Sequence, residues 1–218
     1  MGNRDILIVI YLIANWGVIP FWLLLIFLPN NQITNFFTQS IIPFLLLGVG
    51  YAYLSYKIYL ENNILLKQSP LIVILDHIQD PQNLGSILRT SLGASVDAII
   101  IPKDRACHLT PTVRKVSKAA SEIIPVIVVS NLRNTVKMLQ RNFIEIYACT
   151  GQADLSFFEV DFKGSKALIF GSEDKGIQKF LANEANEKIK IPIDSRLESL
   201  NVSNATSVIL FEAKRQRN

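Results

Sequence analysis

Polar and glycine residues that could serve a ligand gather in three segments of the chain. The first, DPQNLGSILRT (80–90), is a proline turn followed by a helical pattern that carries Asn83 and Arg89. On a helix, Asn83, Ile87 and Thr90 would share one side. Arginine offers a planar, permanently charged set of donors, which suits anionic oxygens. Taken alone, the segment is better explained as a capped helix that happens to carry one arginine.

The second segment, ALIFGSEDKGI (167–177), is an apolar strand pattern that ends in Gly171, Ser172 and Glu173, with Gly176 close behind. Glycines at the end of a strand let a ligand approach the backbone closely. Glu173 would lie at the carboxyl edge of the sheet, where open α/β folds bind ligands. The same pattern also fits an ordinary strand-to-helix turn.

The third segment, IKIPIDSRLESLNVSNA (189–205), crowds Ser199, Asn201, Ser203 and Asn204 around the start of an otherwise apolar helix. Such residues often cap helices by bonding to nearby backbone groups. One cap does not require four such residues, so this segment is also a candidate for a binding site.

Alternating apolar runs and helical patterns must position these segments. The runs are nearly continuous in apolar residues, as in strands buried on both faces of a parallel sheet. Pro111 and Asn131 are typical helix start signals. The predicted strands are 71–75, 98–101, 126–129, 144–149, 167–170 and 189–193, and the predicted helices are 83–95, 110–122, 131–142, 177–187 and 201–217. The pattern predicts an α/β domain with a mostly parallel sheet.

The residues before Pro70 have a different composition, which explains the positive mean hydropathy of +0.30. Residues 6–28 form an uncharged run of 23 residues, long enough for a membrane-spanning helix. A weaker run covers 41–56. We expect a membrane-spanning helical hairpin over 1–65 and a separate soluble domain over 66–218. The alternatives are a cleaved signal peptide for the first run and a buried core helix for the second.

The flanking charges predict the orientation of this hairpin. Arg4 precedes the first run, and Lys57 and Lys67 follow the second, whereas the connecting residues 29–40 are uncharged. By the positive-inside rule both ends face the cytoplasm or its equivalent, such as the plastid stroma. If the runs are not inserted, we expect the chain in the cytoplasm.

The cysteine and histidine content argues against metal and disulfide sites. Cys107 and Cys149 have no CxxC spacing, and His77 and His108 are isolated, so no metal ligand set is expected. Free cysteines fit a reducing compartment. Residues 70–218 carry 19 basic against 16 acidic side chains, a net charge of +3 that permits RNA binding without proving it.

Together the three segments resemble the motifs of the SpoU (TrmH-like) RNA ribose 2′-O-methyltransferases, in the SPOUT superfamily of knotted methyltransferases. The first motif appears as DPQNLGSILRT (80–90), the second as LIFGSEDKGI (168–177) and the third as IPIDSRLESLNVSNA (191–205). Their order and spacing also fit, so the resemblance covers essentially residues 70–217.

The resemblance implies that 66–218 is a SPOUT-type trefoil-knotted methyltransferase domain with S-adenosyl-L-methionine as cofactor. The cofactor would lie bent in the knot, held largely by backbone groups around Gly171, Ile191 and Leu200, with Ser199 at a matching polar position. An apolar slot suits an adenine ring whose edge is read by main-chain donors and acceptors. The resemblance also implies a homodimer.

The catalytic residues implied by the resemblance are Asn83, Arg89, Glu173 and Asn201. Arginine stays protonated in proteins, so it is a poor proton acceptor. We expect Arg89 to donate to the ribose 2′-oxygen or an adjacent phosphate and to stabilise developing alkoxide, with Glu173 holding its guanidinium. The proton could leave through water or phosphate.

The implied substrate is a ribose 2′-hydroxyl of structured RNA, rRNA first and tRNA second. Many relatives carry a small RNA-binding domain where this chain has its two apolar runs, so substrate choice stays open. Residues 1–65 weakly resemble the first half of a plastid and cyanobacterial membrane-protein family linked to carotenoid synthesis. The alternatives are a catalytically silent membrane-anchored RNA-binding protein and a pigment-metabolism membrane protein with a vestigial methyltransferase tail.

Overall fold

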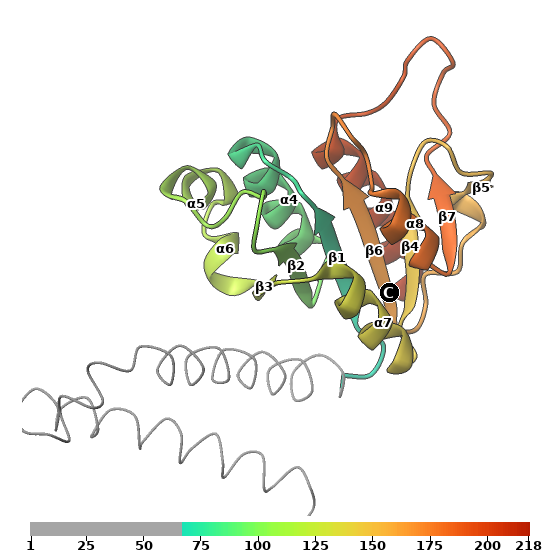
Figure 1. The fold of residues 1–218 in the computed structure, drawn as a ribbon, viewed down its shortest axis with the longest axis horizontal. Helices are drawn as coiled ribbons and strands as arrows, with labels where there is room; N and C mark the ends of the chain where they lie inside the picture. Colours follow the sequence, from blue (N-terminus) through green and yellow to red (C-terminus); the bar gives the residue numbers. More distant parts are fainter. Residues whose placement is uncertain (1–66) are drawn as a thin grey trace, which may run out of the picture. The chain divides into compact units, whose positions relative to one another are not determined.

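A computed structural model of the chain describes residues 67–218 (Figure 1). The predicted membrane hairpin, with its runs 6–28 and 41–56, lies outside the described residues. Within 67–218, no helix is both long and apolar enough to cross a membrane. The described residues form one compact unit, Lys67–Asn218.

The framework of this unit is a seven-stranded sheet in the order β3-β2-β1-β6-β4-β7-β5. Every pairing between these strands is parallel, which confirms the predicted α/β class. The strands are β1 (Leu71–Asp76), β2 (Ala98–Pro102), β3 (Val126–Val129), β4 (Glu145–Cys149), β5 (Leu155–Ser156), β6 (Lys166–Gly171) and β7 (Glu187–Lys190). Only the two-residue β5 was not predicted, because it is too short to produce a pattern.

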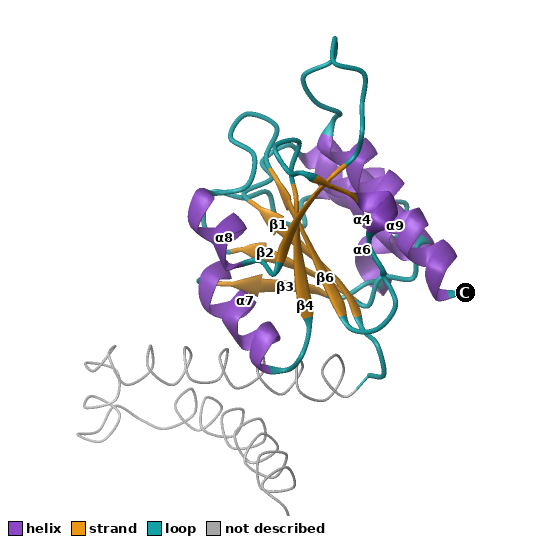
Figure 2. Ribbon diagram, turned by 90° about the vertical axis from the view of Figure 1, so that its right-hand side faces the viewer, coloured by secondary structure: helices purple, strands orange, loops and turns teal. Residues whose placement is uncertain are grey.

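The centre of the sheet is fully buried, as continuous apolar runs require. Every residue of β1 and β2 is buried, and Val73 of β1 stands in register with Ile99 and with Leu168 of β6. Figure 2 shows α7 and α8 on one face of the sheet and α4 and α9 on the other. The helices are α4 (Pro81–Gly93), α5 (Pro111–Ser117), α6 (Ala120–Ile123), α7 (Leu132–Arg141), α8 (Lys179–Glu184) and α9 (Val202–Arg217), with a 3₁₀ turn, η2, at Phe157–Glu159.

Two of the predicted helix starts are confirmed by capping contacts. Thr110 accepts from the backbone N–H of Val113 at the start of α5, where Pro111 occupies the first turn. Asn131 accepts from the N–H of Asn134 at the start of α7, at 3.1 Å. These are local interactions between residues three apart, so the sequence could predict them.

The prediction of one helix over 110–122 is wrong, because the chain breaks it into α5 and α6. Lys118 and Ala119 adopt left-handed backbone angles, with φ of 51° and 67°. The break turns Ala120 and Ile124 into the core, where both are buried. Apolar burial therefore overrides helical continuity at this point.

The bounds predicted around β7 also need correction. The strand expected over 189–193 ends at Lys190, since Pro192 has no N–H with which to continue a ladder. The helix expected over 177–187 ends at Glu184, because the Asn186 backbone donates to the carbonyl of Ile146 in β4. The residues released from β7 become a loop, 191–200.

Candidate active site

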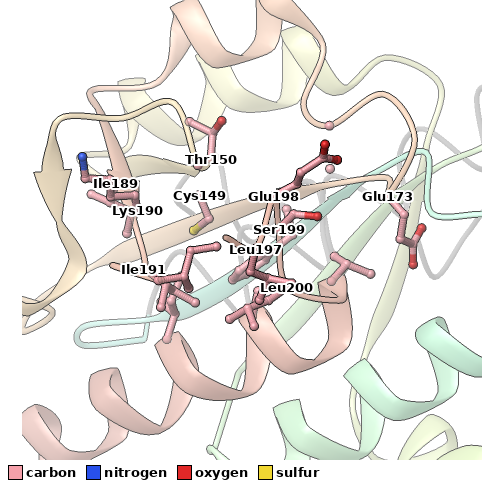
Figure 3. A pocket seen from close by; sticks show the side chains of 18 of the residues that line it. Cys149, Thr150, Glu173, Ile189, Lys190, Ile191, Leu197, Glu198, Ser199 and Leu200 are labelled. Carbon is pink, nitrogen blue, oxygen red and sulfur yellow. The ribbon is translucent and has the colours of Figure 1, made fainter. Parts of the chain in front are cut away.

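A pocket of about 570 Å³ opens at the carboxyl ends of β4, β6 and β7. It is also lined by the loop 191–200 and by the start of α9, and Figure 3 shows side chains from these segments around it. Of the predicted site residues, those that line it are Gly171, Glu173, Ile191, Ser199 and Leu200. Cys149, Thr150 and Ile209 also line it, although no sequence motif indicated them.

The pocket combines an apolar wall with an acidic rim. Isoleucine and leucine side chains make up much of its lining, among them Ile189 and Leu200. Three carboxylates also line it, from Glu173, Asp194 and Glu198, against one basic side chain, Lys190. The Asp194 carboxylate is paired with Arg196 at 2.9 Å, so the acidic excess comes from Glu173 and Glu198. Such a pocket favours a ligand that has both an apolar ring and positive charge.

The turn that carries Glu173 is folded tightly on itself. A Cβ atom at Gly171 would lie 2.1 Å from the carbonyl carbon of Gly176. The Gly176 N–H donates to the carbonyl of Ser172 at 2.8 Å, and Gly176 has a φ of 63°. Gly171 is thus required because the backbone of Gly176 packs directly against it, whether or not a ligand also approaches this position.

The three sequence motifs meet in one hydrogen-bonded network. The side-chain amide of Asn83 in α4 donates to the carboxylate of Glu173. Asn201 donates from its amide to the Asn83 side-chain oxygen at 3.1 Å. Asn201 also caps α9, since its side-chain oxygen accepts from the N–H of Ser203 at 2.8 Å. The network fixes Glu173 at the rim of the pocket.

A buried carboxylate behind this turn was missed by the sequence analysis. Asp76, 1% exposed, ends β1 beside Gly171 of β6. It accepts from the backbone N–H of Gln178 at 2.7 Å and from the Gln178 side-chain amide at 2.9 Å. The Nδ1 atom of His77 lies 2.5 Å from the same carboxylate. The only available signal was an acidic residue directly after the apolar run 71–75.

Arg89 lies outside the network. Its side chain is exposed and makes no hydrogen bond or ion pair with any residue in 67–218. The expectation that Glu173 holds the Arg89 guanidinium is wrong for this structure, in which the Glu173 carboxylate accepts from Asn83. The reason is helical geometry, because six residues place Arg89 roughly two-thirds of a turn around α4 from Asn83. Thr90, at the next position, faces Ser207 of α9 instead.

Comparison with known proteins decides the family. The model of the SpoU rRNA Methylase family matches residues 70–211, which include all three motifs and the pocket. The chain belongs to this family. The expected enzyme class, an RNA 2′-O-methyltransferase, is confirmed, and so is the expected cofactor, S-adenosylmethionine.

Curated relatives include 23S rRNA (guanosine-2′-O-)-methyltransferases named RlmB. The protein from Xanthomonas campestris is 39% identical over 175 residues, which cover 78% of this chain and 70% of the relative. The protein from Pectobacterium atrosepticum is 44% identical over 150 residues, which cover 69% of this chain and 62% of the relative. The chain thus matches only part of the length of these relatives.

Solved structures share the fold of residues 67–218. An AdoMet-bound rRNA methyltransferase from Sinorhizobium meliloti has a TM-score of 0.64 and 27% identity, covering 68% of this chain and 57% of that one. A TrmH/SpoU tRNA modifying enzyme from A. aeolicus has a TM-score of 0.62 and 25% identity, covering 74% and 84%. A second family model, ABA DEFICIENT 4-like, matches residues 9–86, most of which lie outside the described residues.

Proposed function

We propose that the chain transfers a methyl group from S-adenosylmethionine to a ribose 2′-hydroxyl of structured ribosomal RNA. The observation that carries the proposal is the acidic-rimmed pocket with the Asn83–Glu173–Asn201 network at its edge. The RlmB relatives support a guanosine of the large-subunit rRNA as the acceptor. Transfer RNA is the second candidate, supported by the fold neighbour from A. aeolicus.

The pocket fits S-adenosylmethionine in size and in chemistry. Its volume of about 570 Å³ lies within the range typical of cofactor sites. Apolar side chains such as Ile191 and Leu200 would hold the adenine, while backbone groups near Gly171 would bind its edge. The carboxylates of Glu173 and Glu198 suit the positive charges of the sulfonium and amino groups.

When bound, S-adenosylmethionine supplies an electrophilic methyl group. The protein then has to orient the ribose oxygen and stabilise the negative charge that develops on it. Arg89, free of other partners among the described residues, donates to that oxygen or to a neighbouring phosphate. Asn83 and Asn201 are positioning residues that act through Glu173. The 2′-hydroxyl proton leaves to water or to phosphate, since arginine cannot accept it.

The proposal includes attachment to a membrane through residues 6–28 and 41–56, with residues 66–218 as the methyltransferase domain on the cytoplasmic or stromal side. It rests on the two uncharged runs and on the flanking charges. We further propose a homodimer with the family's knotted fold, in which the half-exposed Val208 and Phe211 of α9 are covered. Carbonate extraction tests the attachment, and light scattering on residues 67–218 tests the dimer.

The decisive experiment maps 2′-O-methyl groups in total RNA from cells with and without the gene. We expect one or a few methylated nucleotides of the large-subunit rRNA to disappear with the gene. Purified full-length chain should restore the same sites on unmethylated rRNA, provided S-adenosylmethionine is added. Binding of rRNA without any methyl transfer would instead support the alternative, a catalytically silent RNA-binding protein.

A further inference from the structure

The positive charge of the described domain is concentrated in one segment. Residues 103–118, here called the basic segment, carry five basic side chains and one acidic side chain. The rest of 70–218 carries 14 basic and 15 acidic side chains. The basic segment therefore accounts for the whole positive net charge of this part of the chain.

The cations of the basic segment are exposed and largely unpaired. All five are exposed to solvent, and Arg114 pairs with Glu122. The other four make no side-chain hydrogen bond or ion pair with any residue in 67–218, and they are Lys103, Arg105, Lys115 and Lys118. Their charges are therefore available to an external partner.

The basic segment is packed closely against the helix that carries Asn83 and Arg89. The N–H of Cys107 donates to the carbonyl of Ile78, just before α4, at 2.8 Å. A Cβ atom at Gly85 of α4 would lie 2.6 Å from Val116 of α5, so a glycine is needed for α5 to pack this closely. Figure 1 shows α4 and α5 side by side.

The basic segment also lies at the same edge of the sheet as the pocket. It follows the carboxyl end of β2, and the pocket lies at the carboxyl ends of β6 and β4. Only β1 separates β2 from β6, a spacing of roughly 10 Å at about 4.8 Å per strand. A nucleic acid strand bound along this edge could therefore contact the basic segment and present a ribose at the pocket.

We propose that the basic segment binds the phosphate backbone of the RNA substrate. This inference rests on the proposed function. Exposed lysine and arginine side chains bind phosphates by releasing condensed counterions, whatever the base sequence. The pocket and its network then select the ribose, while the basic segment supplies affinity.

The test compares two double variants of the full chain with equal charge loss. Lys115→Gln with Lys118→Gln removes two cations of the basic segment. Arg141→Gln with Lys163→Gln removes two exposed, unpaired cations near the amino ends of β4 and β6, at the opposite edge of the sheet. Binding of a fluorescently labelled RNA stem-loop is measured by anisotropy over a series of KCl concentrations, together with the affinity for S-adenosylmethionine and methylation of unmethylated rRNA.

For the basic-segment pair we expect weaker RNA binding and a shallower slope of log K against log[KCl], by about 0.7–0.9 for each RNA phosphate that the variant no longer neutralises. The affinity for S-adenosylmethionine should not change, and the control pair should behave like the unaltered chain. Equal effects of both pairs, or no effect of the first, would overturn the inference while leaving the proposed function standing. If the unaltered chain neither binds nor methylates RNA, the proposed function fails as well.

Discussion

The side-chain amide of Asn83 donates a hydrogen bond to the carboxylate of Glu173, although 90 residues separate them in the chain. Asn83 is fixed in α4, where it is 9% exposed, and Glu173 lies on the tight turn after β6. Asn201 donates to Asn83 in turn. The Glu173 carboxylate at the rim of the pocket is therefore oriented by the amide of Asn83, which is itself held by the amide of Asn201.

This relationship predicts coupled effects of substitution. Asn83→Ala removes both hydrogen bonds, whereas Glu173→Gln keeps a side-chain oxygen that can still accept one, so the second change should slow methyl transfer less. Single-turnover rates of Asn83→Ala, of Glu173→Ala and of the double variant measure the coupling, because each single change removes the hydrogen bond. We expect an interaction free energy of about 0.5–3 kcal/mol, within the range for contacting residues. Simple additivity would show that the hydrogen bond has no part in catalysis.

Arg89 should matter for methyl transfer and not for cofactor binding, because it is exposed and does not line the pocket. Arg89→Ala should reduce the rate by a hundredfold to a thousandfold, or about 2.7–4 kcal/mol, as for loss of one donor at a developing oxyanion. Calorimetry should find the affinity for S-adenosylmethionine unchanged.

Arg89→Lys is the matched control for this prediction. Lysine keeps the positive charge but lacks the planar pair of donors, so the variant should stay badly impaired. Recovery of most of the activity would mean that charge alone is sufficient. A large loss of cofactor affinity in Arg89→Ala would place the residue at the cofactor instead of at the RNA.

Gly171→Ala should destroy the cofactor pocket, because the added Cβ would lie 2.1 Å from the backbone of Gly176. The turn that carries Glu173 would have to open, and calorimetry should detect little or no binding of S-adenosylmethionine. Gly93→Ala is the control, since its Cβ would only touch the Phe211 ring at 3.6 Å. Normal cofactor binding by Gly171→Ala would show that this turn does not shape the pocket.

Asp76→Asn should weaken cofactor binding, although Asp76 does not line the pocket. The two donors of Gln178 bind different oxygens of Asp76, and asparagine replaces one of these oxygens by an NH2 group, so both hydrogen bonds cannot be kept. A buried donor left without a partner costs about 1–3 kcal/mol, and the turn before Gln178 should loosen. Faster hydrogen exchange at the Gln178 amide, together with lower affinity for S-adenosylmethionine, checks this. Asp154→Asn, on the exposed surface, should change neither property.

The ion pair between Lys166 and Glu145 should make the free energy of unfolding of the domain depend on pH in the acidic range. Lys166 is 6% exposed, and its ammonium lies 2.5 Å from the Glu145 carboxylate. This hydrogen bond is the main reason that the pKa of Glu145 lies below its ordinary 4.5. A lowered carboxyl pKa stabilises the folded state above pH 4.5, and that contribution is lost as the pH falls through the folded-state pKa.

Glu145→Gln should therefore reduce the free energy of unfolding near pH 7 by at most about 1 kcal/mol, because the Glu145 side chain is half exposed and solvent screens the lost ion pair. At a pH low enough to protonate Glu145 in the folded protein, the difference from the unaltered chain should shrink. Urea unfolding at both pH values measures it. A difference that stays constant with pH would show that the ion pair does not carry the effect.

The apolar runs and the capping residues determined much of the fold by themselves. Strands such as 126–129 and the caps Thr110 and Asn131 depend on side-chain periodicity and on contacts three residues apart, so they can be recognised without the tertiary structure. The three motifs likewise identified the family, because residue type and spacing carry that information directly.

Only the tertiary structure decided which of these residues meet. Asp76 and Gln178 are 102 residues apart, and Asn201 and Asn83 are 118 apart, so no local pattern predicts either contact. The parallel pairing of β1 with β6 places Asp76 beside Gly171 and thereby assembles the site. The same packing leaves Arg89 exposed. A helix buries only the sides that face its neighbours, and α4 buries Asn83 while Arg89 points to solvent.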